Sequence, residues 1–94
     1  MANQFGGATI LWETAAIDFA SSLTLTSDEA SVTVTGAKLG DLVILGQVTA
    51  PASHTMYSAH VSAVDTVKVR FNNYSGGTVN PDSQVFNVGV VSLN

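Results

Sequence analysis

The sequence predicts an all-β domain, a single small antiparallel β-sandwich of seven or eight strands with jelly-roll-like or immunoglobulin-like topology. Val, Ile and Thr recur along the whole chain, whereas Lys, Glu, Arg and Gln, which favour helices, are scarce. Clusters of Gly, Asn, Asp, Ser and Pro interrupt these runs about every ten residues, a spacing typical of sandwiches and barrels. Ninety-four residues make one domain. We expect an N-terminal arm over residues 1–7 and the β-sandwich domain over residues 8–94.

The first half of the chain is expected to hold four strands. Residues 9–12 form the first, and residues 23–26 and 31–35 alternate apolar and polar side chains, as half-buried strands do. The acidic segment 27–30 between them is expected to be a turn or a surface loop. Residues 42–45 are continuously apolar, which predicts a strand buried on both faces.

The clearest prediction in the second half is a hairpin with arms at residues 57–62 and 66–71. Its turn falls at residues 63–65, and alternate residues of the second arm are apolar, so one face of that arm is expected to enter the core. Residues 80–83 have the composition of a turn, and residues 85–93 form the last strand.

The charge content is unusually low. Charged residues make up 11% of the chain, against about 25% in average soluble domains. A weakly charged surface is poorly protected against self-association, and the absence of cysteine leaves association as a source of added stability. We therefore expect a homo-oligomer, specifically a homotrimer.

The charge balance also argues against two classes of partner. Three basic residues stand against seven acidic ones, which is unfavourable for binding nucleic acid or anionic membranes. The first four residues lack the positive charge of a signal peptide, and no apolar run approaches the ~18 residues of a membrane span. We expect a chain that is made in a cytoplasm and stays soluble until it assembles.

No chemical motif predicts catalysis. No serine lies in a G-x-S-x-G sequence, and nearly all the carboxylates that could act as a pair in sugar cleavage fall in predicted turns. On one strand His54 and His60 would lie ~20 Å apart, too far for one metal ion, although a threefold axis could still gather three copies of either. We expect no catalytic residue, metal, cofactor or small-molecule substrate.

Four large apolar or aromatic residues are candidate interface residues: Phe5, Trp12, Met56 and Tyr57. Phe5 precedes two glycines and cannot easily join a sheet, so it either remains free or docks on a neighbour. The only tryptophan of a small sandwich is most often a core residue, but Trp is also enriched at the energetic centres of interfaces. Both alternatives stay open for Trp12.

Four stretches resemble a family of small β-domains encoded by tailed phages. They are VTVTGAKLGD at residues 32–41, YSAHVSAVDTVKVRFNN at 57–73, GGTVNP at 76–81 and FNVGVV at 86–91. The resemblance covers roughly residues 30–92, and the start of the chain matches no motif of the family. Its members look like minor virion components, namely capsid decoration or cement proteins and modules of fibres or spikes. The resemblance implies no catalytic residue.

These observations lead to an expected function that is structural rather than enzymatic. The chain is expected to bind the major capsid protein on the outer surface of a phage head and to stabilise capsomer junctions. A net charge of −4 fits an outer location better than one that faces DNA. The alternative is a receptor-binding or glycan-binding tip module of a phage fibre or spike.

Overall fold

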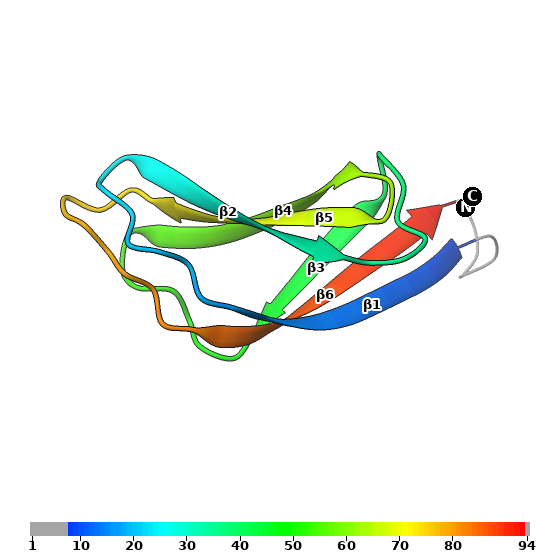
Figure 1. Ribbon diagram of the computed structural model, residues 1–94, viewed down its shortest axis with the longest axis horizontal. Coiled ribbons are helices and arrows are strands. Elements are labelled where there is room, and N and C mark those ends of the chain that lie inside the picture. The colour runs from blue at the N-terminus through cyan, green and yellow to red at the C-terminus, as the bar shows by residue number, and fades with distance from the viewer. Residues whose placement is uncertain (1–7, 94) are drawn as a thin grey trace.

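The computed structural model describes residues 8–93, which form six strands and no helix (Figure 1). The strands are β1 (Ala8–Ile17), β2 (Thr26–Thr33), β3 (Leu42–Gln47), β4 (Thr55–Ala63), β5 (Thr66–Asn73) and β6 (Gln84–Leu93). They make two antiparallel sheets with strand orders β1-β6-β3 and β2-β5-β4. The all-β class is confirmed, but the described residues form six strands, one or two fewer than the seven or eight expected. The predicted arm and Phe5 lie outside those residues.

The two sheets lie face to face and bury one apolar layer between them (Figure 1). The central strand of each sheet supplies three residues with no exposed surface: Val67, Val69 and Phe71 from β5, and Phe86, Val88 and Val90 from β6. Full burial stabilises each such side chain by about 1.5–3 kcal/mol relative to exposure. The core therefore follows the two central strands. No helix able to cross a membrane occurs in residues 8–93.

The β4–β5 hairpin forms as predicted, and its turn is tied to a neighbouring turn. Asp65 has a φ of 63° in the hairpin turn, and its carboxylate accepts the Gly36 N–H at 2.8 Å. The Asp65 N–H donates to the Ala37 carbonyl at 2.9 Å. Gly36 has a φ of 97°, a conformation that residues with a Cβ rarely adopt. The carboxylate and the backbone N–H of one residue, Asp65, thus hold together two turns that are far apart in the sequence.

Asn73, which has no exposed surface, connects two loop segments at the other end of the molecule, the one between β1 and β2 and the one between β5 and β6. Its amide nitrogen donates to the carbonyls of Ser22 at 2.9 Å, Leu23 at 3.2 Å and Gly77 at 2.9 Å. Its amide oxygen accepts the Ser75 N–H at 2.9 Å and the Ser75 hydroxyl at 2.6 Å. All the hydrogen-bonding groups of this side chain are used, as a buried amide requires.

The predictions for residues 23–26 and 27–30 are wrong, because polar contacts override the local pattern. Leu23 and Leu25 lie in a loop, 65% and 78% exposed, and the Leu25 N–H donates to the Asn73 carbonyl at 2.8 Å. The acidic segment belongs to β2 instead. There Glu29 lies opposite Arg70 on β5, whose Nε donates to Glu29 Oε2 at 2.8 Å.

The expectation that residues 42–45 form a strand buried on both faces is also wrong. β3 is an edge strand that pairs with β6 alone among the described strands. Val43 and Leu45 point inward and are half-buried, whereas Leu42 and Ile44 point outward, 56% and 64% exposed. The apolar run therefore places two large side chains on the surface of the molecule.

We expect replacement of Asn73 by Ala to destabilise the fold by about 2–4 kcal/mol, because one buried and two partly buried carbonyls lose their donor. Asn72→Ala is the matched control: its amide makes only contacts of 3.3 and 3.5 Å on the outer face, so its effect should stay below about 1 kcal/mol. Urea unfolding of both variants measures the difference. Equal losses of stability would show that the Asn73 contacts do not hold this end of the molecule together.

Candidate functional site

The outer face of the β1-β6-β3 sheet is apolar and carries no charged residue among those described. We call this surface the apolar face; cross-strand register places on it Ile10, Trp12, Thr14 and Ala16 of β1, Val85, Asn87, Gly89 and Val91 of β6, and Leu42, Ile44 and Gly46 of β3. Trp12 is its most exposed large apolar side chain, at 67%. Such surfaces on soluble domains mark sites of interaction.

Gly89 lies in the middle of the apolar face, opposite both Trp12 and Ile44. A Cβ added there would meet only ordinary contacts, the nearest being the Ile44 carbonyl oxygen at 3.6 Å. Backbone geometry therefore does not require this glycine, which weakens a central strand by about 0.5–1 kcal/mol relative to Ala. Its effect is to leave a flat gap between two large side chains, where another molecule can approach the backbone closely.

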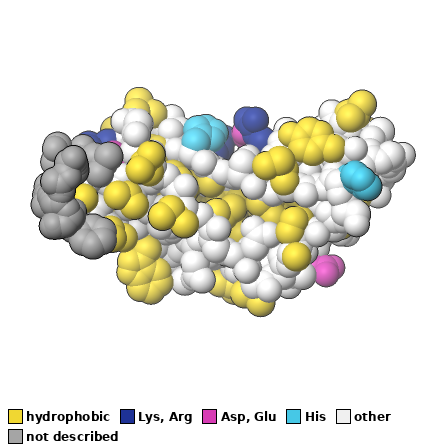
Figure 2. Space-filling view, turned by 180° about the vertical axis from the view of Figure 1, so that it is seen from behind, with side chains coloured by type: hydrophobic (Ala, Val, Ile, Leu, Met, Phe, Trp, Pro, Cys, Tyr) yellow, Lys and Arg dark blue, Asp and Glu magenta, His cyan; other side chains and the backbone are white. Residues whose placement is uncertain are grey.

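The outer face of the β2-β5-β4 sheet is polar and carries the ionic contacts. Glu29 accepts from Arg70 and lies 3.8 Å from the Lys68 ammonium. The hydrogen bond from Arg70 lowers the pKa of Glu29, with further help from the charges of Arg70 and Lys68. Figure 2 shows the Lys and Arg side chains along the upper edge, whereas hydrophobic side chains are spread over the whole view. The two outer faces therefore differ in the partners they can accept.

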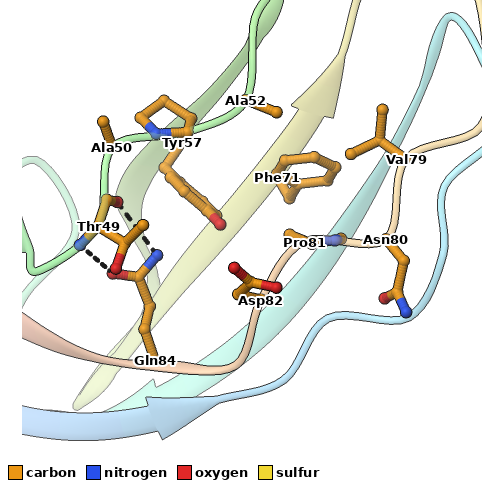
Figure 3. Close-up of a pocket in the computed structure, with 11 residues that line it drawn as sticks. Thr49, Ala50, Ala52, Tyr57, Phe71, Val79, Asn80, Pro81, Asp82 and Gln84 are labelled. Atoms are coloured by element: carbon orange, nitrogen blue, oxygen red, sulfur yellow. Dashed lines mark hydrogen bonds between the residues drawn. The ribbon is translucent and has the colours of Figure 1, made fainter.

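A cleft of about 220 Å³ opens between the β3–β4 loop and the segment before β6 (Figure 3). Gln84 closes one wall, since its amide oxygen accepts the Thr49 N–H at 2.9 Å and its amide nitrogen donates to the Thr49 carbonyl at 3.3 Å. Tyr57 and Asp82 point into the cleft. Burial raises the pKa of Tyr57, the hydrogen bond with Gln84 opposes the shift, and the charge of Asp82 adds to it.

The two histidines lie in different environments. His54 lies in the turn before β4 with a φ of 62°, and His60 lies on the polar outer face opposite Lys68. Within residues 8–93, no three His, Cys, Asp or Glu side chains lie close enough to hold a metal ion.

The candidate interface residues that the structure describes do not form one site. Trp12 lies on the apolar face, Met56 is 45% exposed on the outer face of the other sheet, and Tyr57 points inward to the aromatic core and the cleft. Gly89, which lies opposite Trp12, and Ile44, which lies on the other side of Gly89, were not predicted as interface residues. Residues 10, 12, 14 and 16 share one face of the first strand. The sequence alone does not show whether that face points into the core or to the surface.

Comparison with protein-family models, with curated proteins and with solved structures finds no significant match to this chain.

We expect Asp82→Asn to lower the pKa of Tyr57, because the negative charge that opposes phenolate formation is removed. Gln84→Ala should raise the same pKa, since a hydrogen bond that favours ionisation is lost. Ultraviolet titration of phenolate formation, with Tyr57→Phe to assign the signal, measures both shifts. A raised folded pKa gives stability that is complete below the unfolded value of about 10 and is lost as pH rises through the folded value. A pKa of Tyr57 that neither variant changes would contradict the arrangement of the cleft.

Proposed function

We propose that the chain is a structural protein of a phage virion, a capsid decoration or cement protein that attaches to the outer head surface and stabilises capsomer junctions. Its two-layer fold is then a β-sandwich of the jelly-roll-like or immunoglobulin-like kind. The partner is the major capsid protein, and the chain acts by binding as a homo-oligomer, with no catalytic step. The resemblance to phage β-domains supports this choice of partner, and the exposed apolar side chains of the β1-β6-β3 sheet support the choice of docking surface.

The observation that carries the proposal is the apolar face with Trp12, Gly89 and Ile44 at its centre. Folding alone does not require apolar side chains on the outer face of a sheet, and the β2-β5-β4 sheet carries polar side chains there. This sheet instead exposes Ile10, Trp12 and Leu42, which contribute little to the core from that side. Burying them against a shell would release water from all three, at about 25 cal/mol per Å² of apolar surface.

The distribution of charge supports attachment to protein rather than to nucleic acid. The net charge is −4, and the three basic side chains are too few for a phosphate-binding surface. Two of them, Lys68 and Arg70, lie beside Glu29 on the polar face. A cement protein with this arrangement would turn its polar face to solvent and its apolar face to the shell, and binding would stabilise the shell by mass action.

We expect Trp12→Ser to weaken binding to phage heads at least about 30-fold, the loss of ~2 kcal/mol typical of a central interface residue. The assay is co-sedimentation with heads of a phage whose genome encodes this chain, purified without the chain itself. Tyr74→Ser is the control, because Tyr74 is 59% exposed but lies far from the apolar face, near the loop tied by Asn73. Loss of binding by the Tyr74 variant alone would place the attachment site elsewhere, and no binding by the unmodified chain would refute the proposal.

One observation favours a second candidate, a receptor-binding or glycan-binding tip module of a fibre or spike. The cleft presents the Tyr57 phenol and the Asp82 carboxylate beside two prolines, and these groups are able to bind sugar hydroxyls. Its volume of about 220 Å³ is below the ~300 Å³ of typical ligand sites, so it suits one sugar ring at most. A glycan that perturbs the titration of Tyr57 would favour this candidate over decoration.

A further inference from the structure

Three of the four edge strands carry features that hinder pairing with another chain. β1 has the inward-pointing Glu13, opposite Val88. β2 has the inward-pointing Asp28, whose carboxylate accepts the Ala20 N–H at 3.2 Å. β4 has a bulge between Val61 and Ala63. Inward charges and bulges are the devices by which natural sheets prevent edge-to-edge association.

The fourth edge strand, β3, has none of these devices. Its six residues, Leu42–Gln47, include no charge and no proline, and they pair with β6 in unbroken register. No other described segment makes a backbone hydrogen bond to the free side of β3. Leu42 and Ile44 continue the apolar face to this edge. An edge of this kind is a template for pairing with another strand.

We infer that β3 pairs with β3 of a second copy of the chain, antiparallel and about a twofold axis at Ile44. A second copy is the occupant because the strand complements itself: Ile44 faces Ile44, Leu42 faces Gly46, and Val43 faces Leu45. No charge on either strand opposes this approach. The two three-stranded sheets then become one continuous sheet of six strands, and the oligomer is a dimer in place of the homotrimer expected from the composition.

The register follows from the pleat. Residues directly opposite in an antiparallel pair point to the same side of the sheet, so a register centred on a residue keeps both apolar faces on one side. A shift by one residue would turn the second copy over and set Leu42 opposite the inward-facing Gln47. The centred register therefore doubles the apolar face, and Gly46 leaves room for the Leu42 side chain. This inference depends on β3 alone and stands or falls separately from binding to capsids.

The experiment is mass measurement by analytical ultracentrifugation on the purified full chain over a range of concentrations. The unmodified chain should reach about twice 9.7 kDa. Ile44→Lys should reduce the mass to that of the monomer, because two ammonium groups would face each other at the axis. Ile10→Lys is the matched control, the same substitution on the same face at 59% against 64% exposure, and it should remain a dimer. A mixture of Ile44→Lys and Ile44→Asp should dimerise again, since opposite charges then meet.

Other outcomes would overturn the inference. A chain that stays monomeric, or one that forms a trimer, has no twofold β3 pairing. Monomers from both Lys variants would indicate stacking of apolar faces rather than pairing of edges. If Ile44→Lys does not fold, Ile44→Cys gives a second test: the natural chain has no cysteine, so mild oxidation should produce a disulfide-linked dimer, which Ile10→Cys should not form. Failure of the Ile44→Cys chain to crosslink would refute the register.

Discussion

Phe71 and Phe86 lie on the central strands of opposite sheets, both without exposed surface, and the ring of Phe19 packs between them. The ring centroids of Phe19 lie 6.1 Å from Phe71 and 6.4 Å from Phe86, and Tyr57 completes the cluster at 4.9 Å from Phe86. The chain has no cysteine, so this contact rather than a disulfide fastens the two sheets. Since strand side chains alternate with a period of two, fixing Phe71 and Phe86 inward also fixes which residues must point outward.

In the β2-β5-β4 sheet the outward residues suit a surface in contact with water. In the β1-β6-β3 sheet folding does not explain the outward residues. On β5 the outward residues are Lys68, Arg70 and their polar neighbours, which water and Glu29 satisfy. On β1 and β3 the outward residues include Trp12 and Ile44. The fold does not need apolar side chains there, and the glycine between them, Gly89, adds no contact of its own. The proposed binding of a partner to this face would explain its composition.

The sequence predicted well where one local pattern decides the structure. The 66–71 arm alternates without interruption, and its alternation is the burial pattern that β5 shows. Prediction failed where a distant group decides. Asn73 holds the carbonyls of Ser22 and Leu23, which keeps a strand-like stretch in a loop. Pairing of Glu29 with Arg70 holds an acidic stretch in a strand.

The candidate site could be predicted only in part, for the same reason. The aromatic type of Trp12 marks it as a core or an interface residue, and nothing in its neighbours along the chain decides between them. The apolar run of β3 is identical in appearance to a strand buried on both faces, and only its place at the edge of the sheet exposes Ile44. Whether Trp12 and Ile44 are buried or exposed depends on the order of the strands in the sheet, and no single segment of the chain determines that order.

Hydroxyl-radical footprinting of the chain, free and bound to phage heads, tests most directly whether the apolar face is the interface. Three of the most readily oxidised side chains lie on different surfaces: Trp12 on the apolar face, Met56 on the polar face and Tyr74 near the Asn73 loop, at 67%, 45% and 59% exposure. We expect binding to protect Trp12 while Met56 and Tyr74 remain as reactive as in the free chain. Protection of Met56 or Tyr74 with Trp12 still fully reactive would contradict the account.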